Sequence, residues 1–398
     1  MSLTALEPPF TPAATTTIWY TRCPVPSAWG VALRAGHLHE EFSQDPGIDL
    51  RSVLDATDSK IHDAHFYGTL PNAFRLGGNI PPIWARSRGA TTRVIGISWT
   101  TTPAPVLTLP DSAIRTSADL KGKRLLIIRH PGEEIDFFYA GALRTYEVAL
   151  AAAGLTLRDV TLVEKSVGGS TEHSAPRQTG AEVRRSIRGY DKDAILPLLS
   201  RDVDAIVSQG AAAINLIDSF GLHVVYDTSR DPDPVLRTHN SVPKLLTVDG
   251  RLVDEQPEIV NRILARLLEV PNWAQANPEE AIHFIALEQS LADELVEVTA
   301  GKNFAQELEL NLSDINIARL AAQKAFLLKH GIIEKDFDLN QWIDPKPLEA
   351  ARRLVAERRK NGTASEPSAG KAFRAGPAGC VISPAQARNG TPQRALGS

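Results

Sequence analysis

Short strand patterns alternate with helical patterns over roughly the first 250 residues of this 398-residue chain, and this alternation most constrains its fold. From Pro257 onward only helical patterns remain. Such an order is typical of α/β layers. The strands are predicted at Thr17–Thr21, Asp49–Leu54, Arg93–Ser98, Lys123–Ile128, Asp159–Val163, Asp204–Ser208, Leu222–Tyr226 and Lys244–Val248. The helices are predicted at Pro26–Gly36, Ser117–Gly122 (a single turn), Asp136–Ala153, Asp193–Ser200, Glu258–Ala276, Pro278–Glu288, Leu291–Ala300, Ser313–His330 and Pro347–Lys360.

The length exceeds what one hydrophobic core usually serves, so more than one domain is expected. The net charge of −4 gives no field that favours nucleic acid or a membrane. Two cysteines argue against a disulfide framework and fit a reducing compartment. Residues 1–17 lack the charge and apolar core of a secretory signal, and no apolar run reaches the roughly 18 residues of a membrane span. We therefore expect a cytoplasmic protein with no nucleic-acid or membrane partner.

The last segment, 361–398, is rich in Gly, Ala, Pro and Ser and has no apolar period. Such a segment cannot bury enough apolar surface to offset the entropy lost on ordering. We predict that it is a disordered tail, in which Cys380 has no role.

Cys23 is the one cysteine outside this tail, and it follows a predicted strand directly. Pro24 and Pro26 restrict the backbone around it, which would hold the thiol in one place. Arg22 puts a cation beside it, and a cation favours the thiolate. The alternative is a small buried cysteine that only packs.

Three segments point to a known fold: Ser117–Lys123, Leu198–Ala205 and Pro257–Pro278. They resemble the type-2 periplasmic-binding-protein fold, in its sulfonate, nitrate and thiamine-precursor branch. The resemblance implies two α/β lobes with the ligand in the cleft between them, where open α/β sheets usually bind ligands. Residues 1–106 with 209–360 are predicted to form lobe one, which carries the catalytic residues, and residues 107–208 to form lobe two.

A narrower resemblance rests on Tyr20–Pro26, His65 with Phe66, and Arg75–Pro82. These residues resemble the active-site motifs of the hydroxybiphenyl sulfinate desulfinases, the aromatic sulfinate desulfinases of dibenzothiophene desulfurisation. The likeness continues through residues 325–328 and 339–342. It implies a monomeric hydrolase that splits the carbon–sulfur bond of an arylsulfinate without cofactor or metal and releases sulfite. It also implies that Cys23, His65 and Arg75 are catalytic.

The chemistry of these side chains suits that reaction. The guanidinium of Arg75 can donate two parallel hydrogen bonds to the two oxygens of a sulfinate. Gly77 and Gly78 lack Cβ atoms, so their N–H groups can approach an anion. Cys23 could donate the proton that carbon needs, or attack sulfur as a thiolate, and these roles require opposite charge states. His65 could orient the thiol or exchange a proton with it.

Further contacts are predicted around this trio. Thr21 could relay a proton or hold a sulfinate oxygen, and Phe66 is expected to contact the substrate beside Gly77 and Gly78. His62 is a rival for the role of His65. His62 and His65, with Asp63 between them, could also suggest a metal site, although no further ligand is placed and we expect no metal.

The substrate walls depart from the family pattern. The second lobe offers no aligned tryptophan, and a basic stretch with Arg184, Arg185 and Arg188 stands near one expected wall. These arginines could meet a second acidic group, although a solvated helix face is the ordinary role of such a run. We therefore hypothesise that the substrate is a sulfinate or related acid other than the biphenyl compound. Two other classes also remain: a solute-binding protein for sulfonate-like or nitrate-like anions, and a related cysteine enzyme that acts on a carboxylate.

Overall fold

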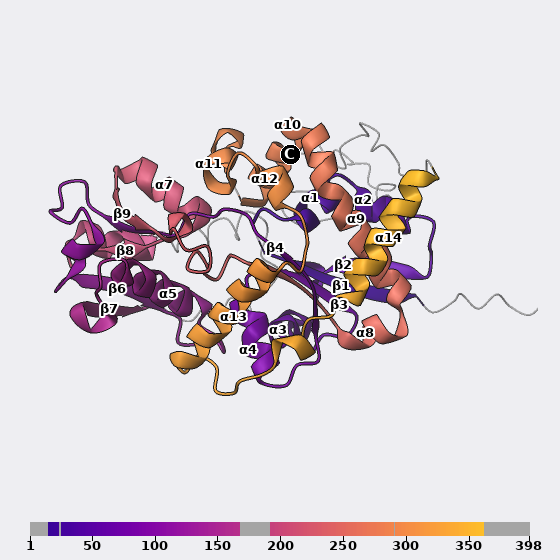
Figure 1. The fold of residues 1–398 in the computed structure, drawn as a ribbon, viewed down its shortest axis with the longest axis horizontal. Coiled ribbons are helices and arrows are strands. Elements are labelled where there is room, and N and C mark those ends of the chain that lie inside the picture. The colour runs from indigo at the N-terminus through magenta and orange to yellow at the C-terminus, as the bar shows by residue number, and fades with distance from the viewer. Residues whose placement is uncertain (1–14, 24, 168–191, 290, 362–398) are drawn as a thin grey trace, which may run out of the picture.

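The structure is a computed structural model that describes residues 15–23, 25–167, 192–289 and 291–361. Helices and strands alternate over three sheets, and helices alone follow the last strand (Figure 1). The predicted α/β class is confirmed. The predicted disordered tail falls, beyond residue 361, outside the described residues.

The main sheet has five strands in the order β2-β1-β3-β10-β4. Strand β1 is parallel to β2 and β3, whereas β10 returns antiparallel between β3 and β4. The carboxyl ends of β1 and β3 therefore lie together at one edge of the sheet. The bounds are β1 (Thr16–Arg22), β2 (Ile48–Ser52), β3 (Ala73–Gly77), β4 (Arg93–Ser98) and β10 (Lys244–Val248).

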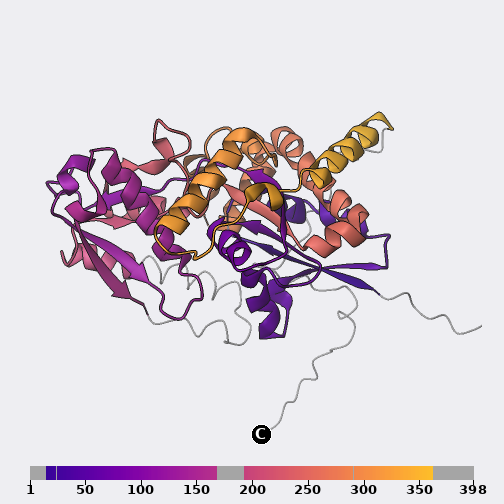
Figure 2. The same cartoon turned by 60° about the horizontal axis from the view of Figure 1, so that its bottom comes forward.

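Two smaller sheets complete the strands. One is antiparallel in the order β8-β5-β9, and the other pairs β6 with β7 in parallel. In Figure 2, β6 and β7 lie at the left, apart from the indigo strands of the main sheet. The bounds are β5 (Pro105–Thr108), β6 (Arg124–Arg129), β7 (Thr161–Ser166), β8 (Ile206–Val207) and β9 (His223–Asp227).

The helices cover both faces of the main sheet and flank the smaller ones (Figure 1). Residues 192–199 are also helical. The α-helices are α1 (Ala28–Arg34), α2 (His37–Phe42), α3 (Ser59–Tyr67), α4 (Ile80–Ser87), α5 (Phe137–Ala151), α7 (Gly210–Phe220), α8 (Gly250–Glu255), α9 (Pro257–Ala276), α10 (Pro278–Gln289), α11 (Val296–Ala300), α12 (Phe304–Glu307), α13 (Asp314–Lys329) and α14 (Lys346–Lys360). The 3₁₀ turns are Val53–Asp55, Ser117–Leu120, Leu157–Asp159, Thr228–Arg230, Asp293–Leu295 and Leu339–Gln341.

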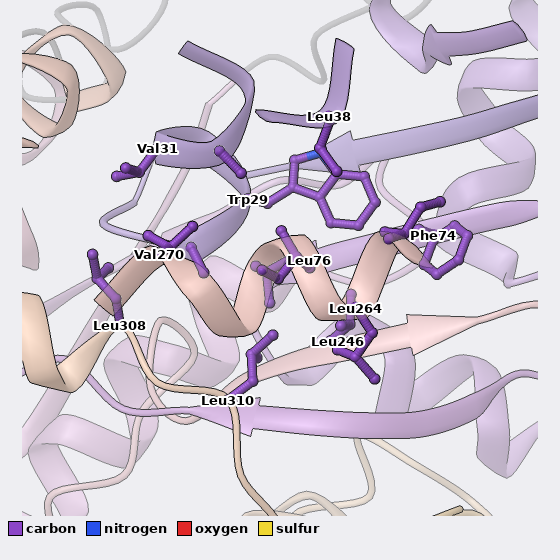
Figure 3. Packing of buried hydrophobic residues seen from close by; sticks show 14 of the residues in the cluster. Trp29, Val31, Leu38, Phe74, Leu76, Leu246, Leu264, Val270, Leu308 and Leu310 are labelled. Atoms are coloured by element: carbon purple, nitrogen blue, oxygen red, sulfur yellow. The ribbon is translucent and has the colours of Figure 1, made fainter. Parts of the chain in front are cut away.

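One face of the main sheet packs against α1 and α9. Alternate residues of a strand point to opposite faces, and Phe74 and Leu76 of β3 both point to this one. Figure 3 shows Trp29 of α1 close to Phe74, and their ring centroids are 5.5 Å apart. Leu246 of β10 joins the same cluster. Each such buried side chain contributes about 1.5–3 kcal/mol, so this face fixes the register of the strands.

The opposite face lies under α3 and α4, and it carries the polar residues of the site. A second apolar cluster joins α4 to the smaller sheets and to α13: Trp84, Leu125 of β6, Tyr146 of α5 and Phe326 all belong to it. The main sheet and the sheet of β6 and β7 are therefore connected by packed side chains. The predicted lobe boundaries stay a prediction.

Most of the predicted elements are confirmed, and β4 and β10 have the predicted bounds. The helix predicted at Leu291–Ala300 is wrong in its first half, where a 3₁₀ turn at Asp293–Leu295 precedes α11. The strand predicted at Asp204–Ser208 shortens to Ile206–Val207. Strands β3 and β5 and helices α2, α3, α4, α7, α8 and α12 were not predicted. In the described part of the chain, every helix is too short or too polar to cross a membrane.

Candidate active site

Cys23 directly follows β1 and is half-buried. Its N–H donates to the carbonyl of Leu76 at 3.1 Å, and its own carbonyl accepts from the N–H of Val25 at 2.8 Å. The first bond extends the β1–β3 ladder by one residue beyond the strand. The thiol is therefore held at the carboxyl edge of two parallel strands, the ordinary position of a ligand site in an α/β sheet.

Arg75 lies on β3, in register with Thr21 of β1. Its side chain is buried, and one guanidinium nitrogen donates to the carbonyl of Gly78 at 2.8 Å. Burial lowers the pKa of Arg75, and the nearby Cys23 acts in the opposite direction. An arginine still stays protonated in a protein. The site thus combines a fixed cation with a thiol close enough to act on it electrostatically.

A hollow of about 390 Å³, counted with the open space at its mouth, lies on the face of the main sheet that α3 and α4 cover. Thr21, Phe66 and Arg75, three of the predicted site residues, all line it. The hydroxyl of Thr21 is buried and has no hydrogen-bond partner within the described residues. Thr21 Oγ1 can therefore accept or donate a hydrogen bond to a bound molecule.

The two glycines after Arg75 leave room for close neighbours. A Cβ atom on Gly77 would lie 2.2 Å from the sulfur of Cys23. A Cβ atom on Gly78 would lie 2.8 Å from the backbone oxygen of Asn240. Both glycines are thus required by packing, in addition to the anion contact predicted for their N–H groups. Gly77 in particular sets where the thiol lies.

His65 and Phe66 are neighbours on α3, whose N-cap Asp58 accepts from the N–H of Lys60 at 2.9 Å. Gly68 ends the helix in the left-handed conformation. The side chains of His65, His62 and Asp63 lie outside the described part of the structure. The roles predicted for these three residues stay predictions.

The arginines predicted near one substrate wall stay a prediction, and an aromatic side chain of the second group of strands and helices has a structural role. Arg184, Arg185 and Arg188 fall outside the described residues. Tyr146 is fully buried and donates its hydroxyl proton to the carbonyl of Leu126 at 2.9 Å, so it is a core residue.

Trp99 directly follows β4, and its ring is partly exposed. The guanidinium of Arg319 covers this ring at 3.6 Å from its centroid. One face of the Trp99 ring is therefore occupied by this guanidinium.

Sequence reasoning missed Lys244, the first residue of β10. Its side chain is fully buried, and its ammonium donates to the hydroxyl of Thr100. Burial lowers the pKa of Lys244 to about 7, while Glu307 and Cys23 act in the opposite direction. The available signal is a lysine at the start of an apolar strand, a position at which a lysine side chain is ordinarily solvated.

Comparisons with known proteins bear on the whole chain. No family model matches it, and no curated protein matches it. A solved structure of a cysteine-to-serine mutant of DSZB in complex with biphenyl-2-sulfinic acid is 25% identical, with a TM-score of 0.70, and the match covers 85% of this chain and 99% of that one. The structure of the desulfurization enzyme DSZB is 24% identical, with a TM-score of 0.68 and the same coverage.

The periplasmic aliphatic sulphonate binding protein SsuA from Escherichia coli has the same fold at lower identity. It is 16% identical, with a TM-score of 0.56, and the match covers 84% of this chain and 92% of that one. Together the matches confirm the predicted fold of the periplasmic-binding-protein type. The predicted resemblance to the desulfinases is confirmed as well, because two structures of DSZB match this chain over 99% of their length.

Proposed function

We propose that this protein is a desulfinase that cleaves the carbon–sulfur bond of an aromatic sulfinate and releases sulfite. The observation that carries the proposal is the convergence of Cys23, Arg75 and Gly77 at the carboxyl edge of β1 and β3. The match to a DSZB mutant in complex with biphenyl-2-sulfinic acid supports it. The substrate is 2'-hydroxybiphenyl-2-sulfinate or a related arylsulfinate.

Arg75 would bind the sulfinate. One guanidinium nitrogen already donates to Gly78, and the remaining N–H donors can pair with sulfinate oxygens. Thr21 lines the hollow beside Arg75, and its buried hydroxyl would supply a further hydrogen bond. Phe66 lines that hollow and would contact the aryl ring. Gly77 and Gly78 would bring backbone N–H groups to the anion.

The reaction balances with the thiol as proton donor. The proton of Cys23 passes to the ring carbon as the carbon–sulfur bond breaks, which leaves the arene, sulfur dioxide and a thiolate. Water then adds to sulfur dioxide to give bisulfite, and the proton released restores the thiol. In the nucleophilic alternative the thiolate of Cys23 attacks sulfur and the carbon–sulfur bond breaks, so that the ring carbon leaves with a proton from His65 and the SO₂ group stays bonded to the Cys23 sulfur. Water then hydrolyses this sulfur–sulfur bond and gives bisulfite and the free thiol. His65 would exchange the proton in either case.

Sulfite release from a panel of aryl and alkyl sulfinates tests the proposal. We expect release by the wild type and none by Cys23→Ser. Cys380→Ser is the matched control, because it removes the chain's other cysteine, and it should retain full activity. Binding of sulfinates or sulfonates without turnover would instead favour a solute-binding protein. Turnover of carboxylates alone would favour the carboxylate-acting relative.

The proposal includes a catalytic Cys23 in a monomeric enzyme of the cytoplasm. Light scattering during size-exclusion chromatography of the full chain tests the oligomeric state. A mass near the 43.2 kDa of one chain is expected, and twice that mass would contradict the proposal.

A further inference from the structure

Asn240 lies at the tip of a tight turn in the connection from β9 to β10. His239 and Val242 pair on either side of the tip, with backbone N–H to carbonyl distances of 2.9 and 3.2 Å. Asn79 is fully buried, and its amide nitrogen donates to the carbonyls of His239 and Pro243 at 2.7 and 2.9 Å. The turn is therefore fixed to the segment that directly follows β3.

Asn240 also occupies the two backbone donors that follow Gly78. Its carbonyl accepts from the N–H of Asn79 at 2.9 Å, and its Oδ1 accepts from the N–H of Ile80, the first residue of α4, at 3.3 Å. The next two residues of α4 are prolines without an N–H, and the donor after them bonds to the N-cap carbonyl. The N-terminus of α4 is thus closed to a bound anion, which leaves Arg75 and the glycine pair to hold it.

The side chain of Asn240 packs directly on Gly78. A Cβ atom on Gly78 would lie 2.9 Å from Oδ1 and 3.1 Å from Nδ2 of Asn240. A Cβ atom on Gly77 would lie 2.2 Å from the sulfur of Cys23. The glycine pair therefore contacts the thiol through one residue and the amide of Asn240 through the other.

One hydrogen bond connects this contact to the cation of the site. Arg75 donates to the carbonyl of Gly78 at 2.8 Å, so a shift of Gly78 also moves the group that orients the guanidinium. A guanidinium pairs with two oxygens of one anion only when its planar fork faces them. The position of Asn240 therefore affects how well Arg75 can bind an anion.

We propose that Asn240 is a positioning residue of the anion site: it fixes Gly78 and, through the carbonyl of Gly78, the guanidinium of Arg75. The thiol is held by a separate bond, from the N–H of Cys23 to Leu76. Loss of the Asn240 side chain should therefore weaken binding of the anion more than it slows the chemical step. The kinetic form of this inference rests on the proposed function, whereas the effect on anion affinity does not require turnover.

Steady-state sulfite release from biphenyl-2-sulfinate by Asn240→Ala is the first test. We expect KM to rise about tenfold, the effect of weakening one hydrogen bond to a charged group, and kcat to change much less. A purely structural role would lower the free energy of unfolding and leave the KM of the folded protein unchanged. Asn277→Ala is the matched control, because Asn277 also bonds a backbone carbonyl, that of Trp273 at 2.9 Å, but at the end of α9.

Calorimetric titration with biphenyl-2-sulfinate in a Cys23→Ser background measures the same effect without turnover. Asn240→Ala should raise the dissociation constant about tenfold. Asn240→Asp provides the answer if Asn240→Ala does not fold, because it keeps an acceptor for Ile80 at a helix start that favours a carboxylate. Its negative charge would compete with the anion for Arg75, so the dissociation constant should rise tenfold or more at low ionic strength and less at high ionic strength.

An unchanged dissociation constant in either folded variant would overturn the proposal. A fall in kcat at unchanged KM would do the same, because Asn240 would then act on the chemical step. Weaker binding by the variants of a protein that releases no sulfite would support the positioning role and reject the desulfinase. A protein that neither binds nor cleaves biphenyl-2-sulfinate would overturn both.

Discussion

Gly77→Ala tests whether the position of the thiol depends on the glycine beside it. The new Cβ atom would lie 2.2 Å from the sulfur of Cys23 and 3.1 Å from its Cβ. Ordinary contact begins near 3.4 Å, so the sulfur has to move by about 1.2 Å. A displacement of about 1 Å at a reacting group costs on the order of 10²-fold in rate, and we expect that loss in kcat for sulfite release.

The effect on stability should be small by comparison. Overpacking costs about 1–3 kcal/mol, but replacing a strand glycine by alanine returns about 0.5–1 kcal/mol. We therefore expect the free energy of unfolding in urea to fall by about 1 kcal/mol. Gly96→Ala is the control. Gly96 lies in β4 of the same sheet, and a Cβ atom added there would make only an ordinary contact, with Leu310 at 3.4 Å. A folded Gly77→Ala protein with wild-type rates of sulfite release and of Cys23 alkylation would refute the reasoning.

Three further substitutions test the charged and buried groups. Arg75→Lys loses the planar fork, so KM for an arylsulfinate should rise tenfold or more in steady-state sulfite assays, and an unchanged KM would exclude Arg75 from substrate binding. Tyr146→Phe removes a buried hydroxyl, so the free energy of unfolding in urea should fall by about 1 kcal/mol with activity unchanged; a loss of activity at wild-type stability would contradict this. Burial raises the pKa of Glu41, but hydrogen bonds from Arg262 and Arg358 outweigh it and hold that pKa below its usual 4.5. The stability contributed by Glu41 is therefore present above that value and is lost as pH falls through the lower, folded pKa. Glu41→Gln should cost about 1.5–3 kcal/mol at pH 7 and progressively less as pH falls through the folded pKa of Glu41, and a cost that does not change with pH would show that the charge is not responsible.

The strands that sequence predicted best are those whose local pattern agrees with their environment. Strand β4 and strand β10 are apolar runs with buried neighbours on both sides, and their predicted bounds hold. Strand β3 was missed because Arg75 and Gly77 are poor strand residues in isolation. Pairing with β1 and β10 decides its conformation, and these partners are distant in sequence.

Cys23 and Arg75 could be predicted as site residues because each stands in a recognisable short motif. The structure brings their strands together in parallel. The part that local sequence could not give is Lys244, whose burial depends on Thr100 and on the α12 segment with Glu307. The burial of one side chain is set by elements that only the tertiary fold assembles, so a lysine at a strand end shows nothing unusual in the sequence alone.

The electrostatics of the site favour an anion. Arg75 is a buried cation, and its guanidinium donates to a neutral oxygen, the carbonyl of Gly78. Such a cation reduces stability, since an apolar side chain of similar size usually serves a core better. The cost is understandable where an anion binds or where negative charge develops, because charges fixed in advance need no reorganisation during the reaction. A sulfinate bound beside Cys23 would supply such negative charge, and a site used only for packing would not need the cation.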